Sequence, residues 1–67
     1  MRYVVRTFHA NPVAGEYTDQ RFRSYAAAQE NVNGTLRYHG DSIRTMQIIH
    51  FDTFGTELLR ETRNGRA

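Results

Sequence analysis

The side chains that could carry out chemistry in this 67-residue sequence form no catalytic or metal-binding pattern. His9, His39 and His50 lack the spacing of metal ligands, and the absence of cysteine excludes thiolate sites and disulfides. His9 and His50 could meet across neighbouring strands, but two histidines without a carboxylate partner would make a weak site. Ser24 and Ser42 suit a helix cap and a turn, with no His–Asp relay near either in sequence. We therefore expect no catalytic residue, no metal and no cofactor.

The acidic residues give no sign of acid–base catalysis either. Glu57 and Glu61 are four residues apart in a predicted strand, where side chains alternate between faces. We expect both on one face, as solvated edge charges. Asp41 and Asp52 fall in predicted turns, where aspartate is common. The sequence therefore favours a binding protein over an enzyme.

All nine basic residues are arginines, and the net charge is +2. Arginine is the better contact for phosphates, carboxylates and aromatic rings, although the codon usage of a GC-rich genome would give the same preference. A net charge this small does not by itself indicate a nucleic-acid-binding protein. Codon usage is the simpler explanation of the composition.

One group of arginines could still form a binding surface. Arg21 and Arg23 share a face of the predicted second strand with Tyr17, and arginines of the first strand could join them. Such a surface could hold nucleic acid through phosphate contacts and base stacking. Because Asp19 lies in its middle, a solvated strand face is the simpler explanation, and nucleic-acid binding is kept as an alternative.

Four segments have the composition of β-strands, and turn residues separate them in pairs. Their ranges are 3–10, 16–23, 43–51 and 56–62. Residues 11–15 would end the first strand, because their proline cannot continue a ladder and their glycine permits a reversal. Residues 52–55 have the composition of a second turn. We therefore expect the two strands of each pair to lie side by side and antiparallel.

The segment between the two pairs is predicted to be a helix. Ser24 can cap its first turn. An apolar stripe with helical spacing follows, made of Tyr25, Ala28, Val32 and Leu36. Gly34 allows the helix to end at Asn33 or to continue to about Tyr38. We favour the longer helix, because Leu36 continues the stripe.

The order of elements is ββαββ, which predicts an α+β fold with one antiparallel sheet of about four strands and one helix on one face. The single domain should span residues 1–62, with residues 63–67 as a flexible tail. No apolar run reaches the roughly 20 residues of a membrane helix, and the N-terminal residues lack the apolar region of a signal peptide. We expect a cytoplasmic protein without a membrane partner.

The predicted strands carry apolar side chains on both faces. In the first strand the two faces are Tyr3, Val5, Thr7 and His9, and Val4, Arg6, Phe8 and Ala10. In the third they are Ile43, Thr45, Gln47, Ile49 and Phe51, and Arg44, Met46, Ile48 and His50. Leu58 and Leu59 of the fourth strand, being adjacent, should point to opposite faces. One short helix can cover only one of these two surfaces.

The uncovered face is therefore a predicted interaction surface, since it mixes apolar groups with arginine. The partner could be another protein or a second copy of the chain, because small domains often complete their cores by dimerising. The contact residues that we favour are Arg6, Phe8, Arg21 and Arg23, an assignment that directs Phe22 into the core.

The sequence resembles a group of small proteins from bacteriophages and mobile elements. The shared features are the strand Tyr3-Val4-Val5-Arg6, a polar second strand, the Ser24-capped, alanine-rich helix, and a closing hairpin from Met46-Gln47-Ile48-Ile49 to Leu58-Leu59. Over residues 3–62 this architecture is similar to ββαββ anti-CRISPR proteins of type I systems. The resemblance implies a non-catalytic accessory protein that blocks a host protein complex in the host cytoplasm. Those proteins are rich in lysine where this chain has only arginine, so the target stays open.

The sequence thus predicts a small binding protein that acts on a host protein or protein complex through the sheet face opposite the helix. Two alternatives remain at this point. One is a nucleic-acid-binding module that uses an arginine and aromatic sheet face, and the other is a homodimeric structural or regulatory protein.

Overall fold

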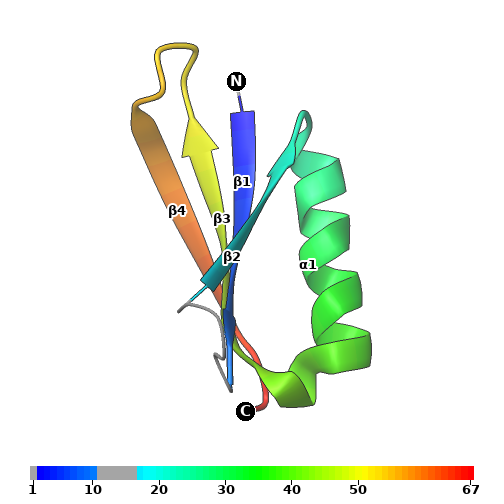
Figure 1. The fold of residues 1–67 in the computed structure, drawn as a ribbon. Helices are drawn as coiled ribbons and strands as arrows, with labels where there is room; N and C mark the ends of the chain where they lie inside the picture. The colour runs from blue at the N-terminus through cyan, green and yellow to red at the C-terminus, as the bar shows by residue number, and fades with distance from the viewer. Residues whose placement is uncertain (1, 11–16) are drawn as a thin grey trace.

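The computed structural model describes residues 2–10 and 17–67, which form one antiparallel sheet with a helix on one side (Figure 1). In chain order the elements are β1 (Arg2–His9), β2 (Tyr17–Phe22), α1 (Tyr25–His39), the short 3₁₀ helix η1 (Gly40–Ser42), β3 (Ile43–Phe51) and β4 (Glu57–Asn64). The strands lie in the order β2-β1-β3-β4, and all neighbours are antiparallel. The predicted α+β class and ββαββ order are confirmed.

The strands follow the predicted segments closely. β3 has the predicted bounds, and β1 and β2 begin and end within one residue of theirs. The predicted turn over residues 11–15 lies outside the described residues. In the second turn, Asp52 Oδ1 accepts hydrogen bonds from the amides of Phe54 and Thr56, and Gly55 has a φ of 83°. A glycine suits this position because other residues rarely adopt positive φ.

α1 begins at the predicted cap and continues past Gly34. Ser24 Oγ accepts a hydrogen bond of 3.1 Å from the Ala27 amide, which satisfies one of the free N–H groups of the first turn. The helix ends at His39, so the longer of the two predicted helices is confirmed. Its apolar stripe faces the sheet: Ala28 and Val32 are fully buried, and Tyr25 and Leu36 pack beside them.

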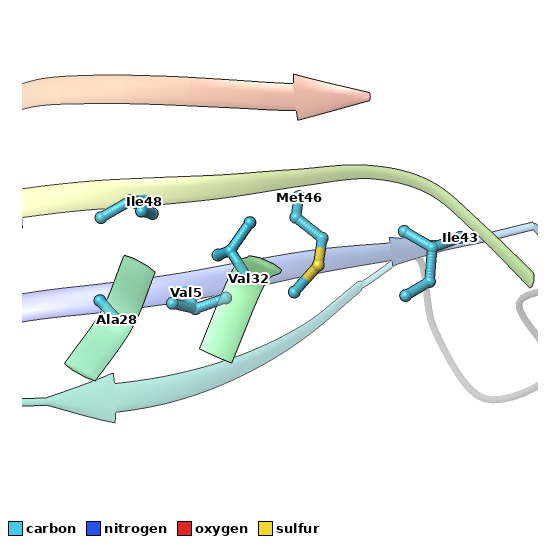
Figure 2. Packing of buried hydrophobic residues seen from close by; sticks show 6 residues of the cluster. All are labelled: Val5, Ala28, Val32, Ile43, Met46 and Ile48. Atoms are coloured by element: carbon cyan, nitrogen blue, oxygen red, sulfur yellow. The ribbon is translucent and has the colours of Figure 1, made fainter. Parts of the chain in front are cut away.

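The core lies between α1 and the sheet (Figure 2). Its buried residues are Val5, Ala28, Val32, Ile43, Met46 and Ile48. Phe22 packs against this cluster, as expected from the assignment of faces on β2. Burial of these aliphatic side chains is the main source of stability that a domain of this size has.

A β-bulge where β1 meets β3 changes the side on which one core residue lies. Phe8 pairs with Thr45 and the next residue, His9, pairs with Ile43, so Arg44 has no partner on β1. The extra residue breaks the alternation, and Ile43 lies on the helix side, where it is buried. The prediction that Ile43 shares a face with Thr45 and Ile49 was therefore wrong.

A second bulge has the same effect on β4. His50 pairs with Leu59 and Phe51 pairs with Glu57, so Leu58 is the extra residue. Glu57 therefore lies on the side away from α1, whereas Glu61, opposite Ile48, lies on the helix side. The expectation that these two glutamates share a face was wrong.

The C-terminal residues are hydrogen-bonded to the junction between α1 and β3. β4 continues to Asn64, two residues beyond the predicted strand. The amides of Gly65, Arg66 and Ala67 then donate hydrogen bonds of 2.8–3.2 Å to main-chain carbonyls of residues 40–44. Residues 63–67, which the sequence suggested as a tail, thus extend the pairing with β3. None of the described helices is long and apolar enough to span a bilayer.

Candidate binding surface

The side of the sheet away from α1 is the surface that the sequence analysis singled out. α1 packs on the other side, and no other described element lies over this one (Figure 1). We call it the open face. Its residues are Arg2, Val4, Arg6 and Phe8 of β1, Tyr17, Asp19 and Arg21 of β2, Thr45, Gln47, Ile49 and Phe51 of β3, and Glu57, Arg60, Thr62 and Asn64 of β4.

Apolar residues cross the middle of the open face. Val4 lies opposite Ile49, and Phe51, two residues further along β3, is half-buried on the same side; we call these three residues the apolar strip. Phe8 is also half-buried on this side, beyond the pair of Arg6 and Gln47. Ile49 is 0% exposed, as buried as any residue under the helix, although no described helix or strand lies over it. Among the described residues, long side chains from the neighbouring strands are the groups that can cover it.

Arg6 lies next to the apolar strip, two residues along β1 from Val4. Its guanidinium makes two hydrogen bonds to the Asp19 carboxylate, of 2.9 and 3.1 Å, and lies 4.0 Å from the ring centre of Tyr17. The hydrogen bond to Asp19 raises the pKa of Arg6, so the guanidinium stays charged. The ring of Tyr17 also lies 5.6 Å from that of Phe8. This part of the open face is held together by charge and aromatic contacts.

Arg60 lies on the other side of the apolar strip, directly opposite Ile49 on β4. It donates to both carboxylate oxygens of Glu57, at 2.6 and 3.1 Å, and to the side-chain oxygen of Gln47 at 3.0 Å. The hydrogen bonds from Arg60 lower the pKa of Glu57. Two arginine–carboxylate pairs thus flank the apolar strip, one on each side.

The predicted contact residues fall in three environments. Phe8 is half-buried on the open face, and Arg6 is there too but already bound to Asp19. Arg21 is exposed on the open face opposite Val4. Arg23 is exposed and follows the last residue of β2, so it stands beyond the strand that was predicted to contain it. Their role in binding stays a prediction.

Comparison with protein-family models, with curated proteins and with solved structures found no match to this chain. We therefore infer function from the chain's own side chains.

The helix side of the sheet holds a polar cluster that sequence reasoning missed. The Tyr25 hydroxyl donates to Glu61 Oε1 at 2.8 Å, and His50 Nε2 lies 2.9 Å from Glu61 Oε2. The ring of Tyr3 packs edge-on against those of Tyr25 and His50, with centres 5.9 and 5.0 Å away. No local signal could have shown this cluster, because its members come from four different elements.

The pKa shifts in this cluster favour a structural role over a role in acid–base chemistry. The hydrogen bonds from His50 and then Tyr25 lower the pKa of Glu61, and the hydrogen bond to Glu61 raises the pKa of Tyr25. Both shifts move the groups away from proton exchange at neutral pH. The cluster therefore closes the end of the core next to β4 with satisfied polar groups.

The histidines do not meet as the sequence allowed. His9 lies opposite Ile43 and His50 lies opposite Tyr3, so the two histidines stand at opposite ends of β1. Within residues 2–10 and 17–67, no group of three His, Asp or Glu side chains could hold a metal ion.

The most exposed large apolar side chains of the second hairpin were not among the predicted contacts. Phe54 in the turn is 91% exposed, and Leu58 and Leu59 at the start of β4 are 54% and 55% exposed. α1 packs on β1, β2 and β3, so the helix leaves the β4 end uncovered. The adjacent leucines were the available sequence signal, and they lie at the edge of the sheet because β4 is its last strand.

Proposed function

We propose that the chain is a non-catalytic binding protein and that a partner protein docks on its open face. The observation that carries this proposal is the apolar strip around Ile49, which is fully buried although no described helix or strand lies over it. Side chains can turn aside when another surface arrives, whereas a packed helix cannot. A partner that replaced them would gain contact with Val4, Phe8 and Phe51.

The composition of the open face supports a protein as the partner. Aromatic residues and arginine are enriched in protein–protein interfaces, and Phe8, Tyr17, Phe51 and Arg21 are of these types. The face also carries two carboxylates, Asp19 on β2 and Glu57 on β4, so each edge strand presents a negative charge. A polyanion lying across the strands would pass near both carboxylates, which disfavours nucleic acid. The phage-type role and the host target implied by the resemblance stay predictions.

Site-specific photocrosslinking tests the proposal in cells of the organism that encodes the chain. A benzophenone amino acid replaces Phe8 on the open face in one variant and Tyr38, which is 74% exposed on α1, in the matched control. We expect a discrete protein adduct from position 8 and none of the same mass from position 38. No adduct at position 8, or the same adduct from both positions, would overturn docking on the open face.

A second candidate function, self-association, is favoured by the free edge of β4. Among the described strands, β4 pairs only with β3. The Gly65 amide donates to the Arg44 carbonyl, and main-chain groups alternate in direction along an antiparallel strand. The amides and carbonyls of Arg60, Thr62 and Asn64 therefore point away from β3. Such an edge is a template for another strand.

Two copies of β4 can pair around a two-fold axis in a register that suits their charges. With Thr62 on the axis, outward-pointing main-chain groups meet, and Glu61 of each copy lies opposite Arg63 of the other. With Glu61 on the axis, two carboxylates would lie opposite each other instead. Charge therefore selects the first register.

Sedimentation of the wild-type chain and a Thr62→Pro variant tests self-association. The proline removes an outward N–H on the axis and leaves the bonds to β3 in place. We expect a concentration-dependent dimer for the wild type and a monomer for the variant, with the same circular dichroism spectrum. A wild-type chain that stays monomeric at millimolar concentration would exclude this candidate.

A further inference from the structure

Three arginines at one corner of the sheet lack the carboxylate partners that other arginines of the open face have. Arg6 is bound by Asp19 and Arg60 by Glu57. The guanidinium groups of Arg2, Arg21 and Arg23 make no ion pair or hydrogen bond with any residue in the described ranges. We call these three residues the arginine corner.

The pairing of β1 with β2 brings the arginine corner together. Tyr3 lies opposite Phe22, and continuing this register places Arg23 next to Arg2 where the strands end. Arg21 is opposite Val4, one step along the same face and diagonal to Arg2. Like charges facing each other across a strand pair are destabilising. The fold therefore holds three positive charges close together, and a bound anion would relieve their repulsion.

The arginine corner is also hollow and borders the apolar strip. One depression is lined by all three arginines and Phe22. A neighbouring depression shares Arg2 and Arg21 and is continued by Val4 and Phe51, with the ion pair of Arg6 and Asp19 also in its lining. A ligand seated there would meet guanidinium groups at one end and apolar side chains at the other. This combination suits an acidic side chain next to an apolar one on the same partner.

We propose that the arginine corner binds carboxylates of an acidic segment on the partner protein. The inference rests on the proposed docking at the open face and specifies its chemistry. Guanidinium groups bind carboxylates through paired hydrogen bonds, so three of them can hold a short acidic stretch. A short carboxylate-bearing protein segment is favoured over nucleic acid because three guanidinium groups gather at one corner, whereas Arg6 and Arg60 elsewhere on the open face are paired with Asp19 and Glu57.

Titration by two-dimensional NMR with defined probes tests the arginine corner directly. The probes are a hexaglutamate peptide, a hexaglutamine peptide and an eight-residue oligothymidylate, all at low salt. We expect hexaglutamate to shift the amide signals of Arg2, Arg21 and Arg23 in a saturable way, and hexaglutamine to shift none. Tighter binding of the oligothymidylate than of hexaglutamate would overturn the choice of a protein ligand. No shift with hexaglutamate would overturn the site.

Two double variants that remove the same charge distinguish binding at the arginine corner from general attraction of the peptide to a basic protein. The Arg21→Gln/Arg23→Gln variant should bind hexaglutamate about tenfold more weakly or worse, because it loses charge-assisted hydrogen bonds. The control is Arg44→Gln/Arg37→Gln, which removes the same charge at exposed positions outside the corner. Its affinity should stay within about twofold of the wild type. Equal losses in both double variants would show that net charge, and not the corner, binds the peptide.

The photocrosslinking experiment distinguishes failure of this inference from failure of the proposed function. If the adduct from position 8 forms equally well in the Arg21→Gln/Arg23→Gln background, docking on the open face stands and the arginine corner has no part in it. If hexaglutamate binds at the corner but no adduct forms, the anion site stands without the proposed docking. If the adduct is lost only in the corner variant, both are supported.

Discussion

Each face of the sheet buries an isoleucine of β3 almost completely, but by different means. Ile48, on the helix side, is 1% exposed, and Ile49, its neighbour on the open face, is 0% exposed. Ile48 belongs to the cluster packed under α1 (Figure 2). Ile49 lies between Val4 of β1 and Arg60 of β4, and Arg60 is hydrogen-bonded to Glu57 at the surface.

The difference shows that complete burial does not by itself identify a core. A helix packed on a sheet is fixed by its own backbone hydrogen bonds and by many apolar contacts. Exposed arginine–carboxylate pairs contribute little stability and rearrange easily. The apolar residues of the open face are thus covered by side chains that can move, and the proposed docking requires this mobility.

The largest effect is expected from removing a side chain on the helix side. Ile48→Ala deletes buried methyl groups where α1, β1 and β3 cannot easily close the gap. We expect a loss of about 3–5 kcal/mol in the free energy of unfolding, measured by urea denaturation. This is a large part of the stability of a small domain, so the variant and the wild type should both be measured in the presence of a stabilising salt.

The same substitution one residue later provides the direct test of the comparison. Ile49→Ala should cost less, about 2 kcal/mol, because the flexible side chains above it can collapse into the space. The difference between the two variants is the quantity of interest. Equal losses would mean that the side chains over Ile49 are as rigidly packed as the helix. They could then not move aside for a partner, as the proposed docking requires.

Regular alternation made much of this architecture predictable from sequence. The stripe from Tyr25 to Leu36 and the cap at Ser24 are local signals, and the helix followed them. β1 and β2 have an unbroken register from Tyr3 to Phe8, so the faces of Arg6, Phe8 and Arg21 could be assigned from sequence. Even the choice between two helix ends was decided correctly by the position of Leu36.

The errors came from two β-bulges, which depend on how neighbouring strands fit together. Each bulge reverses the alternation for the residues beyond it, and this changed the faces of Ile43 and Glu57. Neither position carries a glycine or another local mark of a bulge. The cluster of Tyr25, His50 and Glu61 was missed for the same reason, because it exists only once β4 is paired with β3.

Acid should affect the two faces unequally. The pKa of Glu61 is lowered by His50 and Tyr25, and the pKa of Glu57 is lowered by Arg60. A carboxyl whose folded pKa is depressed adds stability above its unfolded pKa, near 4.3, and loses it as the pH falls through the folded value. We expect Glu61→Gln to flatten this loss more than Glu57→Gln does, since Glu61 is the less exposed of the two.

The measurement is the free energy of unfolding in urea at several pH values between 7 and 2.5 for both variants and the wild type. A larger flattening by Glu57→Gln would show that the open face, and not the helix side, holds the more strongly coupled carboxylate. That result would contradict the view of the open face as loosely closed.

The smallest effect is expected from a change that strengthens the helix layer alone. A methyl group added at Gly34 would meet nothing within 4 Å, and the residue lies inside α1. Gly34→Ala should therefore raise the free energy of unfolding by about 1 kcal/mol through helix propensity. Because α1 covers only the opposite side of the sheet, the affinity of the arginine corner for hexaglutamate should not change. A change in that affinity would mean that the two faces are coupled through the sheet, and that the open face cannot be treated as a separate binding surface.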